Sequence, residues 1–241
     1  MRRGYPIILL SVLVVTAMMA VPSAYTEEGP EDIYGSVVLM MIDKDSGTAE
    51  RMCLSMLKRD PRDARAMVLL GELYWSAGEK GRAIKMFRKA LKYDRALPDA
   101  SFFLGKAYFS ERKPEKGREC FDRYLDLTKD MVVGEDIWTY LHLSRLNAIA
   151  YIYYNHRYYD DSTDIYDRII SLWPDDQKAH YNRGVLYYNG YKKVSEAYKE
   201  MKKVIDIDPA SDMARKAEFY IDYMRRNPDP RMAGDLSFMY E

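Results

Sequence analysis

The residues with the greatest potential for chemistry are three histidines and two cysteines, and their spacing argues against a metal site. The histidines are His142, His156 and His180, and the cysteines are Cys53 and Cys120. Structural and catalytic zinc sites usually draw cysteine or histidine ligands from closely spaced pairs. None of these five residues pairs with another at such a spacing. The sequence therefore predicts no metal centre and no cofactor.

Two short segments, Ser55–Lys58 and Ser110–Lys113, have the Ser-x-x-Lys spacing of some acyl-transfer enzymes. The companion motifs of those enzymes are missing, and so short a pattern arises by chance. No glycine-rich phosphate loop is present. The pairs Asp160-Asp161 and Asp175-Asp176 stand beside predicted turns, where carboxylates favour helix starts. Because an enzyme needs titratable groups that converge on one site, we expect a non-catalytic protein with no catalytic residue.

A repeat of 34 residues organises the chain. Three features recur at that spacing: Leu70-Gly71 with Leu104-Gly105, Tyr74 with Tyr108, and Phe87 with Phe121. A short unit that recurs in register usually cannot bury its own apolar face, so it stacks on copies of itself. The repeat predicts an elongated binding scaffold and says little about the identity of the partner.

Each unit has the pattern of two helices joined by a turn. Apolar residues at offsets of three and four predict one helix through Met67–Tyr74 and a second through Ala83–Leu91. Ala77-Gly78 lies between them, and glycine is a poor helix former that suits a turn. Small residues at Gly71 and Ala83 would let the two backbones approach closely.

These residues resemble the pattern of the tetratricopeptide repeat family. The resemblance covers roughly residues 30–211, within a repeat domain placed at 25–211. Its units lie near residues 30–63, 64–97, 98–131, 143–176 and 177–211, and the last has one extra residue around Asn189-Gly190. The resemblance implies an all-α fold, a right-handed α-α superhelix (a tetratricopeptide-like solenoid) of about five helix pairs plus a C-terminal capping helix.

Three segments depart from the repeat. Residues 132–142 are an insertion that is either a simple spacer or an early start of the next helix, which Asp136 to Tyr140 favour. Residues 212–226 mix apolar and charged side chains and predict the capping helix, because a terminal unit needs a polar outer side. Proline at 228 and 230 ends that helix, and we expect residues 227–241 to be a flexible tail.

The amino terminus has the features of a secretory signal. Arg2 and Arg3 precede an almost wholly apolar stretch, Ile7 to Val21, and Pro22 to Ala24 end it. A permanent membrane span wants about 20 apolar residues, so this stretch is marginal as an anchor. Both interpretations of residues 1–24, cleaved signal or retained anchor, place the repeats outside the cytoplasm. We expect an exported, extracytoplasmic or membrane-anchored protein that meets the membrane only through this segment.

Charge composition argues against nucleic acid as a partner. The chain of 241 residues has 37 basic and 37 acidic residues, and phosphate recognition needs a concentrated basic face. Basic and acidic residues alternate along the helical stretches, which is typical of a solvated surface.

The two cysteines lie about 20 Å apart if two helix pairs separate them, beyond disulfide reach, so we expect free, buried thiols.

The resemblance also implies where a partner binds. In this family the first helix of each pair lines a concave surface, where extended peptides or partner helices lie. Carried over position by position, the predicted partner-binding residues are Arg65, Val68, Glu72, Trp75, Phe102, Lys106, Phe109, Asn147, Tyr151, Tyr154, Lys178, Tyr181 and Tyr188. Their seven aromatic rings favour a groove for a polypeptide segment, since aromatic residues supply much of the energy at interfaces. The alternative is that the C-terminal cap or tail folds into the groove and buries these rings.

The predicted function is a non-catalytic scaffold, exported or membrane-tethered, that binds another protein or a peptide segment in the concave groove. Two alternatives remain open: a structural or assembly subunit of an envelope complex, and an accessory domain of an envelope enzyme. The sequence leaves the oligomeric state undetermined.

Overall fold

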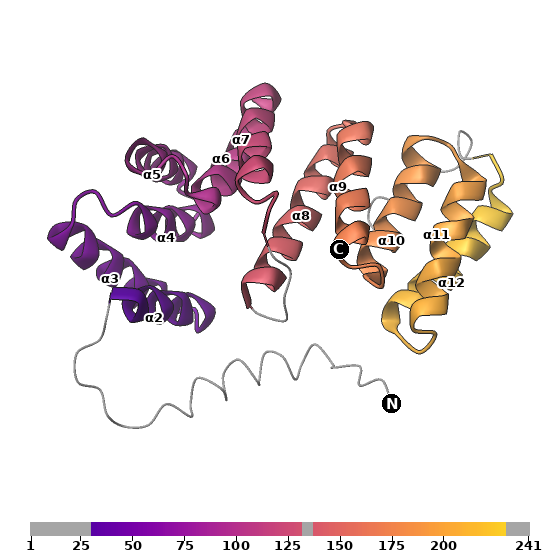
Figure 1. Ribbon diagram of the computed structural model, residues 1–241, viewed down its shortest axis with the longest axis horizontal. Coiled ribbons are helices and arrows are strands. Elements are labelled where there is room, and N and C mark those ends of the chain that lie inside the picture. The colour runs from indigo at the N-terminus through magenta and orange to yellow at the C-terminus, as the bar shows by residue number, and fades with distance from the viewer. Residues whose placement is uncertain (1–29, 132–136, 230–241) are drawn as a thin grey trace. The chain divides into compact units, whose positions relative to one another are not determined.

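The computed structural model describes residues 30–131 and 137–229. The predicted signal or anchor, residues 132–136 of the insertion and residues 230–241 of the tail lie outside this range. The chain divides into two compact units, residues 1–61 and 62–241. All regular structure in the described residues is helical, and consecutive helices pack in pairs (Figure 1). The predicted all-α solenoid of helix pairs is therefore confirmed.

The described part of the first unit holds one helix pair, α2 (Pro30–Ile42) and α3 (Ser46–Arg59). Asp45 begins α3, because its carboxylate accepts a hydrogen bond of 3.0 Å from the backbone N–H of Thr48. Such a cap satisfies one of the amide donors that a helix start leaves unpaired. Val37, Ala49 and Cys53 are fully buried within this unit.

The second unit holds the other pairs and a final helix. Its elements are α4 (Ala64–Ser76), α5 (Lys80–Tyr93), α6 (Pro98–Ser110), α7 (Pro114–Leu127), α8 (Ile137–Asn155), α9 (Tyr159–Leu172), α10 (Gln177–Val185), η1 (Leu186–Gly190), α11 (Val194–Ile207) and α12 (Asp212–Arg226). Asp63, Asp176 and Ser211 cap three of these helices by accepting from the amide three residues on. Asp176 is thus a helix cap, as the sequence predicted.

Close backbone contact inside each pair depends on small residues. At Gly105 in α6, an added Cβ would lie 2.6 Å from the ring of Phe121 in α7. Ala83 in α5 is likewise fully buried. A larger side chain at these places would separate the two helices, since protein interiors have little spare volume.

The turn inside each pair contains one residue in the left-handed region. These residues are Lys44, Gly78, Arg112, Arg157 and Lys192, with φ between 58° and 79°. Successive members of this set are 34, 34, 45 and 35 residues apart in the sequence. The spacing of 45 exceeds the repeat length by the eleven residues of the insertion, and the spacing of 35 exceeds it by the one extra residue of the last unit. The turn geometry therefore repeats even where glycine is replaced by lysine or arginine.

The fold absorbs the two sequence irregularities locally. The extra residue of the last unit lies in η1, a π-helical turn in which the Tyr191 N–H donates to the Leu186 carbonyl at 3.2 Å. A single inserted residue in a helix commonly produces such a turn. The insertion before α8 ends in helix, because α8 begins at Ile137 and runs for 19 residues. An early start of that helix was one of the two interpretations of the sequence.

Helix α12 covers the last helix pair. It packs against α11 and α10, and its Tyr220, Ile221 and Met224 enter a buried cluster with Tyr181 and Met201. Its remaining surface carries mostly charged residues, as a terminal cap requires, together with the exposed Phe219. Within residues 30–131 and 137–229, no helix combines the length and apolar character that crossing a membrane demands.

Candidate functional site

The structure separates the thirteen predicted partner-binding residues into two groups by burial. All lie on the first helices α4, α6, α8 and α10 or on η1, as predicted. The exposed or half-buried residues are Arg65, Glu72, Trp75, Lys106, Tyr151 and Lys178. The buried residues are Val68, Phe102, Phe109, Asn147, Tyr154, Tyr181 and Tyr188.

The expectation that all seven rings line an open groove is wrong for Phe102 and Phe109, which are core residues. Phe109 stacks on Phe121 at 5.3 Å between ring centroids, and Phe102 contacts Phe121 and Tyr124. The reason is a second small residue, Gly117 in α7. A Cβ at Gly117 would collide with the Phe109 ring, so the missing side chain lets Phe109 sink between the helices.

The rings of Tyr154, Tyr181 and Tyr188 are also enclosed. Tyr220 of the capping helix meets Tyr181 and Tyr188 edge to face, at 6.0 and 5.8 Å between centroids. The Tyr188 hydroxyl donates to the Asn227 carbonyl at 2.8 Å. For these two rings the alternative interpretation is correct, because the C-terminal cap covers them. Tyr154 accepts a hydrogen bond from Asn189 at 3.1 Å and is buried within the second unit.

Three of the six residues that stay accessible share one repeat position. Glu72 in α4, Lys106 in α6 and Tyr151 in α8 are equivalent, because they are 34 and 45 residues apart in successive units. We call these three residues the inner row. Helices α4 and α6 are in contact, as are α6 and α8, so the row crosses three neighbouring first helices.

Lys106 is the cation of the inner row. Its ammonium lies 5.3 and 5.7 Å from the ring centroids of Phe102 and Phe103, within the range of a cation–π attraction. Within the described residues it makes no ion pair with a carboxylate. Burial lowers the pKa of Lys106, and nearby Glu72 acts in the opposite direction. A half-buried cation of this kind can attract a partner's carboxylate or backbone carbonyl.

Glu72 differs from an ordinary surface carboxylate. Burial raises its pKa to about 8, although Arg145 and Lys106 favour the ionised form. Loss of hydration disfavours the charged form of an acid, and here that cost exceeds the attraction of the two cations. Burial therefore favours the protonated form of Glu72, and in that form the side chain can donate a hydrogen bond.

Arg145 on α8 is a functional candidate that the sequence analysis missed. Its guanidinium donates to Asp99 of α6 at 2.7 Å and lies 5.6 Å from the Phe102 ring centroid. The repeat alignment contained a sign of this role, because the positions equivalent to Arg145 in the two preceding units are the small residues Ala66 and Ala100. Both alanines are fully buried. A long cationic side chain at the same position therefore makes the surface of α8 differ from that of α4 and α6.

The side-chain amide of Asn147, also on α8, has a hydrogen-bond partner for its NH2 group but none among the described residues for its oxygen. Its side-chain amide donates to the Leu143 carbonyl at 3.0 Å, while its Oδ1 has no hydrogen-bond partner among the described residues. Buried polar atoms are normally paired, so each exception requires an explanation. An amide oxygen beside the inner row can accept from a partner's backbone N–H after a small side-chain movement.

Two of the histidines and one of the motif serines make hydrogen-bond contacts with neighbouring helix residues. His142 is buried with its Nδ1 2.7 Å from the Tyr124 hydroxyl, and His180 lies 2.8 Å from the carboxylate of Glu200. Ser110 donates to the Ala107 carbonyl at 3.0 Å. Neither cysteine forms a disulfide, as predicted, but the expectation that both thiols are buried is wrong for Cys120, which is half-buried. No group of three or more histidine, cysteine or acidic side chains is arranged for a metal in residues 30–131 and 137–229.

Comparison with known proteins establishes the family. A family model described as a tetratricopeptide repeat matches residues 48–92, 70–131 and 147–212, which together exceed half of the chain. The chain belongs to the tetratricopeptide repeat family. The matched segments run from residue 48 in α3 to the end of α7, and from residue 147 in α8 to the end of α11. The family pattern therefore includes the part of each helix that carries an inner-row residue.

The similar proteins support the fold of this tetratricopeptide repeat protein, and they do not establish its biological role. A TPR repeat-containing protein of Methanocaldococcus jannaschii, MJ1428, is 27% identical over 141 residues, or 58% of this chain and 24% of the relative. The chain thus spans about a quarter of that relative's length. Among solved structures, MamA matches with a TM-score of 0.58 at 22% identity, covering 74% of this chain and 91% of MamA. YrrB, described as a TPR protein with an unusual peptide-binding site, has a TM-score of 0.56 at 20% identity, covering 87% and 96%.

Proposed function

We propose that this tetratricopeptide repeat protein is a non-catalytic scaffold that binds a segment of another polypeptide across the first helices of its second unit. The observation that carries the proposal is Lys106, a half-buried cation over two aromatic rings without a carboxylate partner among the described residues. Tyr151 lies at the equivalent position of the next unit and is exposed. Tyrosine is enriched among the residues that supply most of the binding energy at interfaces, and α6, which carries Lys106, contacts α8, which carries Tyr151.

The partner's binding mode follows from the groups available. Lys106 would donate to an acceptor, Glu72 in its protonated form would donate a hydrogen bond, and the Asn147 Oδ1 would accept one. An extended peptide backbone presents carbonyls and amides in alternation, so it complements this set without requiring one sequence. YrrB, which shares the fold, is described as having a peptide-binding site, and this supports a peptide segment as the partner.

The test is affinity capture with the full chain from cells that make it. A variant with Lys106→Ala and Tyr151→Ala should lose the captured partner, while one with Tyr198→Ala and Lys199→Ala should retain it. Tyr198 and Lys199 are a matched pair, because they are exposed on the second helix α11. Equal capture by both variants would refute the assignment of the surface.

Export or membrane tethering is part of the same proposal, and it is supported by the basic, apolar and small-residue order of residues 1–24. Fractionation of cells followed by amino-terminal sequencing tests it. A mature terminus at or near residue 24 supports cleavage, and an intact Met1 in the membrane fraction supports an anchor. An intact Met1 in a soluble cytosolic fraction would reject both.

A further inference from the structure

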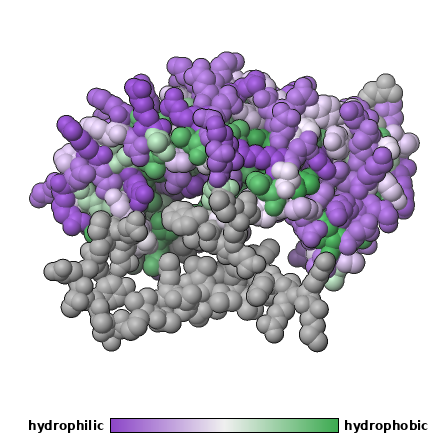
Figure 2. Space-filling view, in the orientation of Figure 1, coloured by the Kyte–Doolittle hydropathy of each residue, from purple (hydrophilic) through white to green (hydrophobic). Residues whose placement is uncertain are grey.

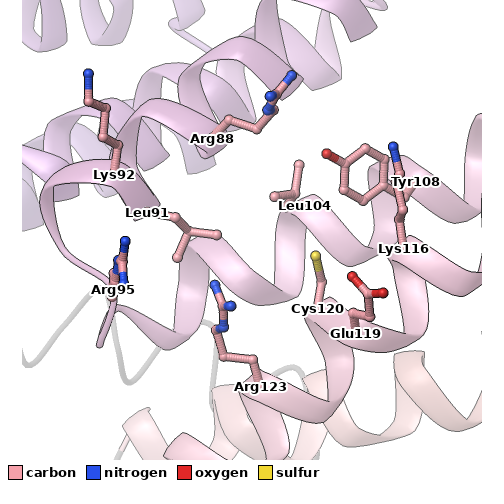
Figure 3. A pocket seen from close by; sticks show the side chains of 10 residues that line it. All are labelled: Arg88, Leu91, Lys92, Arg95, Leu104, Tyr108, Lys116, Glu119, Cys120 and Arg123. Atoms are coloured by element: carbon pink, nitrogen blue, oxygen red, sulfur yellow. The ribbon is translucent and has the colours of Figure 1, made fainter.

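A second surface of the second unit forms a pocket that the inner row does not use. It lies between α5, α6 and α7 and has a volume of about 470 Å³. Figure 3 shows Leu91 of α5 and Leu104 of α6 facing the same space, with Cys120 and Arg123 of α7 directed toward them. Pockets of this size commonly accept a compact ligand or one side chain of a partner.

The charge around this pocket is strongly positive. Its basic residues are Arg88, Lys92, Arg95, Lys116 and Arg123, whereas its one acidic residue is Glu119. Within the described residues, none of the five cations forms an ion pair with a carboxylate. In Figure 3, Arg88 and Lys92 extend outward at the rim. A concentration of one charge around an apolar wall focuses the electrostatic potential on whatever enters.

This charge pattern corrects one expectation from the sequence. Basic and acidic residues were expected to alternate along the helices, but α5 contains six basic residues and no aspartate or glutamate. Figure 2 shows a largely hydrophilic face over the helices of the second unit, with hydrophobic residues between them. The zero net charge of the whole chain therefore conceals a local excess of positive charge.

We propose that this pocket binds an acidic segment of a polypeptide partner that inserts one apolar side chain. The cations at the rim would pair with the segment's carboxylates. Leu91, Leu104 and the half-buried Tyr108 form the apolar wall that the inserted side chain would contact. The two kinds of lining residue thus specify the two features of the ligand, negative charge and one apolar group.

Other anions fit the pocket less well. A nucleic acid backbone is bound by cations that follow a line of phosphates, and it makes no use of the leucines inside the pocket. A lipid surface is flat, whereas the leucines here lie within a pocket between three helices. We therefore treat nucleic acid and anionic membrane as competing outcomes of the experiment.

Cys120 provides a probe that is specific to this pocket. Its thiol lines the pocket and is half-buried, whereas Cys53 is fully buried in the other unit. Burial raises the pKa of the Cys120 thiol to about 11, so an uncharged alkylating reagent at mildly alkaline pH gives a slow, measurable rate. In the full chain with Cys53→Ala, a ligand in the pocket should slow that rate.

The ligand probes are three synthetic peptides. The first alternates glutamate and glycine around one central leucine, the second replaces every glutamate by glutamine, and the third replaces the leucine by serine. We expect the first peptide to slow alkylation of Cys120 at least tenfold at saturation. The second should give no protection, and the third should need at least a tenfold higher concentration.

Variants separate this pocket from other surfaces. Arg95→Ala with Arg123→Ala should weaken protection by the first peptide at least tenfold, while Lys199→Ala with Lys203→Ala on α11 should leave it unchanged. Circular dichroism checks that each variant is folded. The pair Lys106→Ala and Tyr151→Ala should also leave protection unchanged, so failure here is distinct from failure of the inner row.

Three results would overturn the proposal. The first is alkylation that stays unchanged at saturating peptide. The second is protection that is insensitive to Arg95→Ala with Arg123→Ala. The third is stronger protection by a single-stranded oligonucleotide or by phosphatidylglycerol vesicles, which would assign the pocket to another class of anion.

Discussion

The ring of Phe87 lies directly over Gly71, so closely that a Cβ on Gly71 would be 2.5 Å from Cε1 of Phe87. The two residues belong to the paired helices α4 and α5, and the Phe87 ring is fully buried. The same relationship recurs 34 residues later between Gly105 and Phe121. The absence of a side chain at this position lets the two helices of these two pairs approach closely.

Gly71→Ala should therefore destabilise the second unit. The added methyl group has no space unless Phe87 or a backbone moves, and overpacking of this kind costs about 1 to 3 kcal/mol. The matched control is Gly81→Ala in α5, because nothing lies within 4 Å of a Cβ built there. That change should stabilise the helix by roughly 0.5 to 1 kcal/mol. Urea unfolding monitored by circular dichroism distinguishes the two variants. Equal unfolding midpoints for Gly71→Ala and Gly81→Ala would contradict the packing argument.

The repeated left-handed turn gives a second prediction. Arg112 occupies the position that glycine holds at 78, with φ of 58° against 79°, and a side chain costs about 1 to 2 kcal/mol in that conformation. Arg112→Gly should therefore raise the free energy of unfolding, by less than about 1 kcal/mol because glycine also gains entropy in the unfolded chain. Gly78→Ala is the reverse control and should lower it by a comparable amount. A stabilising Gly78→Ala would be incompatible with the turn described.

His142 makes stability depend on pH. Burial lowers its pKa to about 4, and Arg168 and Arg145 act in the same direction. Because the unfolded chain binds the proton at a higher pH, near 6.5, stability should fall as the pH decreases from 6.5 to 4. The full effect is about 3 kcal/mol, from about 1.4 kcal/mol for each unit of pKa.

His142→Gln removes this titration. Its unfolding free energy, measured by urea titration at several pH values, should change less than that of the original chain between pH 6.5 and 4. A slope that matches the original chain throughout that range would show that other groups cause the acid sensitivity.

Much of the fold was predictable because the repeat fixes local structure. The range 212–226 predicted for the capping helix coincides with α12, since Ser211 caps its start and proline follows its end. The extra residue near Asn189-Gly190 was visible as a change of spacing. The sequence did not predict that this residue forms the π-helical turn η1, because a loop longer by one residue would accommodate it equally well.

The candidate site was harder to predict because burial depends on two helices at once. The spacing places Phe109 on the first helix of its pair, but its burial follows from Gly117 on the second. Tyr181 and Tyr188 face α12, which follows the repeats and has no repeat register of its own. Glu72, Lys106 and Tyr151 were predicted individually, whereas their alignment as one row appears when the helix contacts are known.

The central claim, that a polypeptide partner lies across the inner row, is tested most directly by crosslinking. A photoreactive amino acid replaces Tyr151 in one version of the full chain and Tyr198 in another. The two tyrosines are similarly exposed, at 36% and 39%, on a first and a second helix. Irradiation in the native cell should yield a crosslinked partner protein from position 151 and not from position 198. Crosslinks from position 198 alone would contradict the account.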